Sequence, residues 1–141
     1  MALVTWLVGW YAIHFAGFYD TALENPWLLN VEHAILIAIG LLFWWPVIAG
    51  VPHALSSLAA LGYLGAAFVG SSFLGLALTF STTALYSFYE DVPRIWGLSP
   101  VRDQNYGGIL MNAEQALVFL VAIGYFVARL LREEDAEAAL R

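Results

Sequence analysis

The sequence contains no cysteine and no lysine among its 141 residues. Without cysteine the chain forms no disulfide, no thiolate metal site and no cysteine nucleophile. All five basic residues are arginines, and eleven acidic residues give a net charge of −6. A nucleic-acid partner is therefore not expected, because it would require a basic face. No basic segment precedes the first apolar run, so we do not expect that run to be a cleavable signal peptide.

Apolar residues are abundant instead. They make up 62% of the chain, the mean hydropathy is +0.77, and only 11% of residues are charged. Soluble domains average roughly 45–50% apolar residues, and a membrane-spanning helix needs about 20 of them in a row. Four stretches qualify: Ala2–Tyr19, Val31–Ile48, Leu55–Phe80 and Gly107–Leu131. The sequence therefore predicts an all-α, polytopic membrane protein with four transmembrane helices in one domain over residues 1–131.

The connecting segments suggest an orientation. The link Ala49–Ala54 is short, which makes the second and third spans antiparallel neighbours. The link Ser81–Tyr106 is long and rich in aromatic rings that favour the membrane interface. Arg129 and Arg132 flank the end of the fourth span and Arg141 follows, so the positive-inside rule predicts a short polar cytoplasmic tail over residues 132–141. Four spans then place the N-terminus in the cytoplasm as well, and the long link becomes an interfacial, extracytoplasmic loop.

Four side chains with donor atoms are expected at one depth below the outer membrane surface: His14, His33, Met111 and Glu114. His14 precedes the outer end of the first span by five residues, which at 1.5 Å per residue is about 7–8 Å. His33 lies in the first turn of the second span. Met111 and Glu114 are three residues apart and share a helix face. Imidazole and thioether together are a ligand set suited to copper, especially Cu(I). A zinc ion is less apt, because zinc sites rarely use methionine.

Further polar residues are expected near the depth of these four donor side chains. Glu32, Asp20, Glu24 and Asp103 are expected at the mouth of the site, whereas His53 is expected at the opposite membrane face. Each donor also has a plainer interpretation. A single histidine in a membrane helix is more often a hydrogen-bonded packing residue, and a methionine often fills gaps. Glu114 requires a partner in hydrocarbon, which its neighbours Asn112 or Gln115 would also supply.

The third span carries small residues at helical spacing. Gly62, Ala66 and Gly70 form one series, and Ser71, Gly75 and Thr79 form a second. Such residues let helices approach closely in lipid. Tight packing within the chain is the favoured interpretation, and a seam for docking a partner is the alternative.

Several segments resemble the CtaG family, whose members are associated with assembly of caa3-type cytochrome c oxidase. The resemblance is carried by Glu32-His33, by GLLFWWPVI (Gly40–Ile48), by SSFLGLALT (Ser71–Thr79) and by WGLSPVRDQNYGGILMNAE (Trp96–Glu114). It extends over most of the chain, and the DQxxGG segment with its methionine is fairly specific. The positions that match recurrent motifs of the family are His33, Asp103, Gln104, Met111 and Glu114.

The resemblance implies a polytopic helical protein that helps to supply copper to the oxidase. Larger members have about seven spans, including an upstream helix rich in His and Met, and nothing here matches that helix. This chain therefore looks like the C-terminal half, and a second subunit is a candidate source of the remaining helices.

The sequence and the resemblance suggest two functions. The first is a copper-handling assembly factor for a haem–copper oxidase in the plasma membrane of a prokaryote, with oxidase subunits as partners. The second is a non-catalytic accessory subunit of a respiratory membrane complex. An enzyme is not expected, because Ser71 and Ser72 have no placed base.

Overall fold

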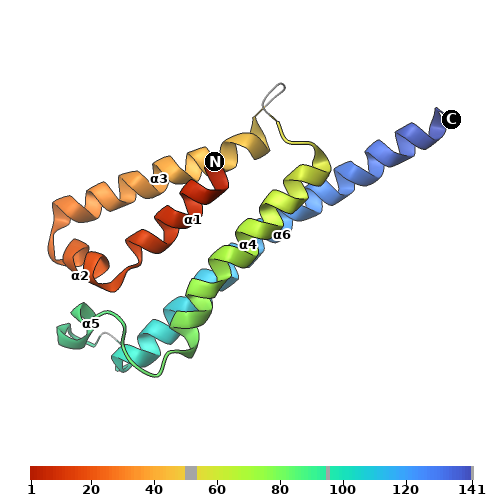
Figure 1. Ribbon diagram of the computed structural model, residues 1–141. Coiled ribbons are helices and arrows are strands. Elements are labelled where there is room, and N and C mark those ends of the chain that lie inside the picture. The colour runs from red at the N-terminus through yellow and green to blue at the C-terminus, as the bar shows by residue number, and fades with distance from the viewer. Residues whose placement is uncertain (50–53, 95, 141) are drawn as a thin grey trace.

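The computed structural model describes residues 1–49, 54–94 and 96–140, and within these ranges the chain is built from helices and connecting loops (Figure 1). The helices follow in the order α1 (Ala2–Ile13), α2 (Ala16–Glu24), α3 (Pro26–Ile48), α4 (Ser57–Phe80), α5 (Phe88–Asp91) and α6 (Pro100–Ala139). The predicted all-α class is confirmed. His53 and Arg141 lie outside the described residues.

Three helices, α3, α4 and α6, are long and apolar enough to cross a membrane. The helices α1 and α2 meet this condition only as a pair, and they are bent by 66° at the short break between them. The expectation of one continuous helix over Ala2–Tyr19 is therefore wrong. The helix is interrupted because Phe15 takes an extended conformation (φ −64°, ψ 124°). No Pro lies at this point to indicate the break.

Two helices begin earlier than expected, and each has a side-chain cap. The Oδ1 atom of Asn25 accepts a hydrogen bond from the amide of Trp27 at 3.0 Å, and α3 starts next to it. The Oγ atom of Ser99 accepts one from the amide of Arg102 at 3.3 Å, and α6 starts at Pro100. Ser or Asn followed by Pro is the usual start of a helix. The polar run that follows Arg102 therefore lies within α6 and not in a loop.

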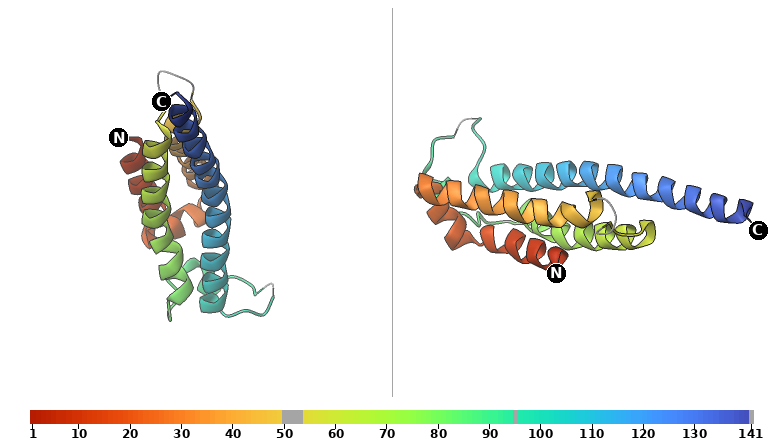
Figure 2. Two further views of the ribbon diagram at one scale, coloured as in Figure 1. Left: turned by 90° about the vertical axis from the view of Figure 1, so that its right-hand side faces the viewer. Right: turned by 90° about the horizontal axis from the view of Figure 1, so that it is seen from above.

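The bundle consists of two helix pairs, α1 with α3 and α4 with α6 (Figure 1). The two pairs meet at a core formed by Phe43, Ala60, Leu64, Ala67, Phe119 and Phe126. The ring of Trp6 stacks on that of Phe43, with 4.5 Å between centroids. The α4–α6 contact is long, and α6 extends well beyond it (Figure 2). The polar residues from 132 onwards continue this helix as far as Ala139.

The small residues of α4 mainly serve packing within the chain. Ser71 and Gly75 are buried on the side that faces α6. Gly70 packs against Leu7 of α1, whereas Gly62 has no neighbour that a methyl group would meet within 4 Å. The series Ser71, Gly75 and Thr79 thus forms the contact between α4 and α6. The series Gly62, Ala66 and Gly70 contacts the rest of the chain only in part.

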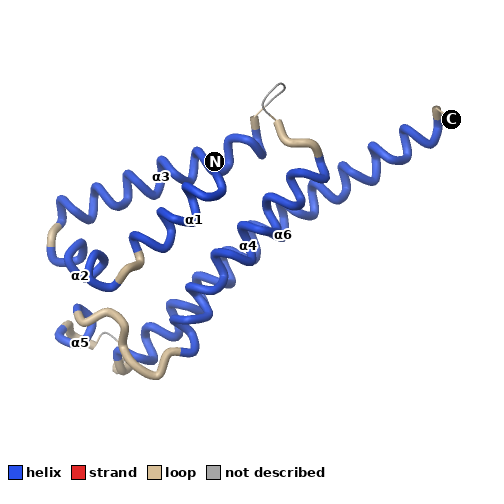
Figure 3. The backbone as a smooth tube through the Cα atoms, viewed as in Figure 1, coloured by secondary structure: helices blue, strands red, loops and turns tan. Residues whose placement is uncertain are grey.

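The two ends of the bundle differ. The N-terminus, the C-terminus and the start of α4 lie at one end, while α2 and α5 lie at the other (Figure 1). The segment between α4 and α6 is mostly non-helical and folds across that second end (Figure 3). The segment between α4 and α6 therefore lies at the end of the bundle opposite the termini (Figure 1).

Candidate functional site

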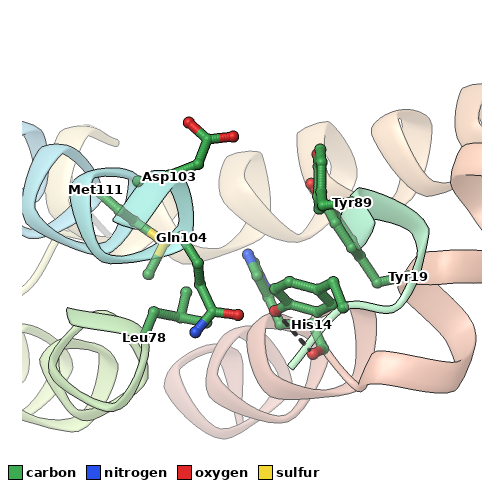
Figure 4. A pocket seen from close by; sticks show the side chains of 9 residues that line it. His14, Tyr19, Leu78, Tyr89, Asp103, Gln104 and Met111 are labelled. Carbon is green, nitrogen blue, oxygen red and sulfur yellow. Dashed lines mark hydrogen bonds between the residues drawn. The ribbon is translucent and has the colours of Figure 1, made fainter. Parts of the chain in front are cut away.

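A cavity of about 270 Å³ lies at the end of the bundle that carries α2 and α5. It is enclosed by the bend between α1 and α2, the end of α4, the segment around α5 and the first turns of α6 (Figure 4). Its lining residues are His14, Tyr19, Leu78, Tyr86, Tyr89, Asp103, Gln104, Gly107 and Met111. Four residues singled out from the sequence, His14, Asp103, Gln104 and Met111, therefore share one cavity.

His14 is held in a fixed orientation at the bend. Its Nδ1 atom lies 2.7 Å from the carbonyl oxygen of Trp10. A carbonyl only accepts hydrogen bonds, so Nδ1 carries the proton and Nε2 keeps its lone pair. The imidazole also packs between two aromatic rings, with centroid distances of 4.7 Å to Trp10 and 6.2 Å to Tyr19. The side chain is thus presented to the cavity in the tautomer that suits a metal ligand.

Met111 lines the opposite wall of the cavity. It projects from α6 and faces the side on which His14 and Tyr19 lie (Figure 4). It is half-buried, whereas Asp103 is exposed near the mouth. The cavity therefore combines one imidazole and one thioether with a carboxylate close to solvent.

The amide of Gln104 is engaged with the backbone. Its Oε1 atom accepts a hydrogen bond from the amide of Leu85 at 2.7 Å, and its Nε2 atom donates to the carbonyl of Thr83 at 3.3 Å. The neighbouring Asn105 donates to the carbonyls of Leu78 and Ser81, at 2.9 and 3.1 Å. These two amides fasten the segment after α4 to α6, so their role is to shape the cavity.

Asp20 does not line the cavity but holds the segment around α5 in place. One of its carboxylate oxygens accepts hydrogen bonds from the amide and the hydroxyl of Ser87, at 3.0 and 2.7 Å. Nearby, the hydroxyl of Tyr86 donates to the carbonyl of His14 at 3.2 Å. Burial, followed by the negative charge of Asp20, raises the pKa of Tyr86 to about 12. Tyr86 therefore stays a neutral hydrogen-bond donor at physiological pH.

Sequence reasoning missed the tyrosines as site residues. Tyr19, Tyr86 and Tyr89 line one side of the cavity, and the rings of Tyr19 and Tyr86 lie 4.6 Å apart. The last two had been interpreted as interfacial aromatic residues. The signal in the sequence is the pair Tyr86 and Tyr89, three residues apart in the aromatic segment that follows the third apolar stretch.

Glu32 is buried beside this cluster. Its side chain is 4% exposed, and its Oε2 atom has no hydrogen-bond partner among the described residues. Its negative charge is the smallest of the contributions that raise the pKa of Tyr86. Glu24, by contrast, is exposed.

The two remaining predicted donors lie elsewhere. His33 is exposed on α3 and Glu114 is exposed on α6, and neither lines the cavity. Among the described residues, no group of three or more His, Asp or Glu side chains is placed to hold a metal ion. The four-residue copper site stays a prediction, and the structure brings only His14 and Met111 of that set into one cavity.

A family comparison relates this architecture to known proteins. The family model described as cytochrome c oxidase caa3 assembly factor (Caa3_CtaG) matches residues 1–133. The chain belongs to this family. The match covers the cavity and all the helices except the end of α6, so the resemblance carried by the motif segments is confirmed.

A relative adds context. An uncharacterized protein of Mycobacterium leprae (strain TN) is 28% identical over 128 residues, which are 88% of this chain and 19% of that protein. The chain thus spans about a fifth of the length of this relative. No solved structure matches the chain.

Proposed function

We propose that this chain handles copper during assembly of a caa3-type haem–copper oxidase, holding the ion near the outer face of a bacterial membrane. The observation that carries the proposal is the cavity that His14 and Met111 line together, with Nδ1 of His14 engaged by a backbone carbonyl and Nε2 left as the metal-binding atom. Membership of the oxidase assembly factor family supports an oxidase as the recipient.

The chemistry of the cavity suits Cu(I) as cargo. Imidazole and thioether are ligands that favour soft copper, and Cu(I) tolerates low coordination numbers. Asp103 near the mouth adds negative charge that attracts a cation. Two neutral donors bind less tightly than a full ligand set, which is appropriate for an ion that must be passed on. In this role the protein delivers copper and catalyses no reaction.

The proposed orientation rests on the arginines near the C-terminus, while Arg94 and Arg102 at the other end stand beside the acidic residues Glu90, Asp91 and Asp103. Arg129 and Arg132 lie towards the end of the bundle that holds the termini, and basic residues favour the cytoplasmic side. The cavity lies at the other end, so this orientation places it on the extracytoplasmic side. Copper would then be held on the same side of the membrane as the extracytoplasmic copper centres that receive it.

Copper titration of the purified protein in detergent under reducing conditions tests the proposal. We expect His14→Gln and Met111→Leu each to weaken Cu(I) binding at least about tenfold, a loss in the range seen when metal sites are perturbed. Both substitutions nearly preserve side-chain volume. His33→Gln is the matched control, because His33 is exposed outside the cavity, and it should bind copper like the unmodified chain.

Equal copper binding by all four proteins would refute the cavity as the copper site. In that case the second function, an accessory subunit of a respiratory complex, would remain. It would be supported if affinity purification from membranes recovered oxidase subunits in stoichiometric amounts from the His14→Gln strain as well.

A further inference from the structure

A second concavity lies between α3 and α6, nearer the end of the bundle that holds the termini. It has a volume of about 630 Å³, and its walls include Trp44 and Val47 of α3 and Val118, Val121 and Tyr125 of α6. We call it the α3–α6 groove. The helix α3 packs on α1 and α2 while α6 packs on α4, so this side of the bundle stays open.

The groove exposes large apolar side chains. Val121 is 68% exposed and Tyr125 is 63% exposed, and Trp44 is only partly covered. Exposure of this kind is normal where a helix faces lipid. Apolar residues alone therefore do not distinguish a lipid-facing surface from a docking site for another helix.

Two polar side chains lie on the same helix faces. Glu114 precedes Val118 by four residues and Val121 by seven, so it continues the α6 wall of the groove by one to two turns. On α3, His33 precedes Trp44 by eleven residues, which is three turns along the same face. Both side chains are exposed and lie beyond the residues that line the groove, on the side towards the cavity. The charged residue that lines the groove itself, Arg129, is at its other end and is paired with Glu133.

These side chains make a purely lipid environment unfavourable. A carboxyl group within a membrane span is costly when it faces hydrocarbon, and such groups are found facing protein or water. Within the chain, the neighbouring Gln115 is already bonded to Phe68 and Ser72 of α4. Glu114 projects about 100° away from Gln115 around α6 and is exposed, so it lies outside this set of contacts.

We propose that the α3–α6 groove is the docking site for one transmembrane helix of another polypeptide. That helix presents apolar residues to Trp44 and Val121 and carries a hydrogen-bond donor, such as Arg, Asn or Ser, at the level of Glu114. The argument rests on charge complementarity with the exposed Glu114 and His33 and on the apolar walls, and it holds independently of copper binding. The partner is recognised by its apolar length and by this single polar group.

The absence of cysteine makes the test direct, because one introduced cysteine is the only thiol. Val121→Cys places a thiol in the groove. Leu120→Cys is its matched control, since Leu120 is 69% exposed but projects about 100° away around α6. Both variants are expressed in the native host, labelled in membranes with a benzophenone maleimide and illuminated. Cross-linked peptides are then identified by mass spectrometry.

The expected result is an adduct from position 121, and little from 120, to an apolar segment of at least about 18 residues in another membrane protein. Adding Glu114→Ala should lower the yield of this adduct about threefold, the effect of an interhelical hydrogen bond of average strength in a membrane. Glu114→Gln keeps an acceptor at this position and should retain most of the yield.

Three outcomes would overturn the proposal: adducts only to lipid, adducts between two copies of this chain, or equal yields from positions 120 and 121. None of them bears on the cavity, because His14 and Met111 are unchanged in these variants. Conversely, His14→Gln should leave the adduct from position 121 intact even if copper binding is lost.

Discussion

Gly107 and Gly108 are neighbours in the sequence but lie in different surroundings. A methyl group on Gly108 would lie 2.6 Å from the carbonyl oxygen of Gly75 and 2.7 Å from the amide nitrogen of Thr79, whereas one on Gly107 would meet nothing within 4 Å. Only the second glycine is therefore required by the contact between α4 and α6. The paired glycines of the motif thus have separate roles.

This difference gives a matched pair of variants. Gly108→Ala should lower the free energy of unfolding by about 1–3 kcal/mol, because backbone atoms of α4 have to move to accept the methyl group. Gly107→Ala should leave stability unchanged or raise it slightly, since alanine favours a helix. Denaturant unfolding in detergent, followed by circular dichroism, measures both. Equal effects of the two substitutions would contradict the close approach at Gly108.

Tyr86 makes the stability of the loop around α5 dependent on pH. Burial and the nearby Asp20 raise its pKa to about 12, above the ordinary value of about 10. The neutral phenol is favoured in the folded state, so its contribution is fully present below about pH 10 and is lost as the pH rises towards 12.

We therefore expect the melting temperature in detergent to fall as the pH is raised above about 10, and to fall less steeply in Tyr86→Phe. At neutral pH the Tyr86→Phe substitution should lower the free energy of unfolding by about 0.5–1.5 kcal/mol, because the hydrogen bond to the carbonyl of His14 is lost. Tyr125→Phe, whose ring is 63% exposed, is the control and should follow the unmodified chain. If the melting temperature of Tyr86→Phe fell as steeply with pH as that of the unmodified chain, Tyr86 would not be the source of the pH dependence.

At the scale of single residues, the sequence predicted chemistry better than orientation. His14 and Met111 were expected together and share the cavity. His33 and Glu114 were expected at the same depth, but they point out of the bundle. Depth follows from counting residues along a helix, whereas direction depends on which face another helix covers. That information lies in the tertiary packing and not in the spacing.

At the scale of helices, the apolar stretches located α3, α4 and α6, since each is long and hydrophobic throughout. Their starting points depend on the caps, and the Asn25-Pro26 and Ser99-Pro100 pairs were present in the sequence as signals. The interruption between α1 and α2 had no such signal. Apolar residues continue through it, so composition alone predicts one helix where the backbone forms two.

At the scale of the whole molecule, the two helix pairs are joined by a few specific contacts besides the aromatic core. The hydroxyl of Tyr11 donates to the carbonyl of Gly70 at 2.6 Å, and Asp20 accepts hydrogen bonds from Ser87. The second contact ties α2 to the segment that covers the cavity. Asp20 had been expected at the mouth of a metal site, but it fastens that cover.

Removing this tie should loosen the cover without unfolding the bundle. We expect Asp20→Ala to increase hydrogen–deuterium exchange in residues 81–94 and to leave α4 and α6 protected, because the lost bonds lie outside the α4–α6 contact. Glu24→Ala is the control, since Glu24 is an exposed acid on the same short helix. Protection in residues 81–94 that is the same in both variants would show that Asp20 is not the fastening point.

The 66° bend between α1 and α2 also limits how far this pair reaches through a bilayer. At 1.5 Å per residue, the twelve residues of α1 extend about 18 Å, and the nine of α2 add only about 5 Å along the same axis. The two residues at the bend add at most about 7 Å, so the pair at best only just reaches the hydrocarbon thickness of about 30 Å. If the pair forms one crossing, it has no length to spare, and the imidazole at the bend stays close enough to the membrane surface for hydrated ions to reach it.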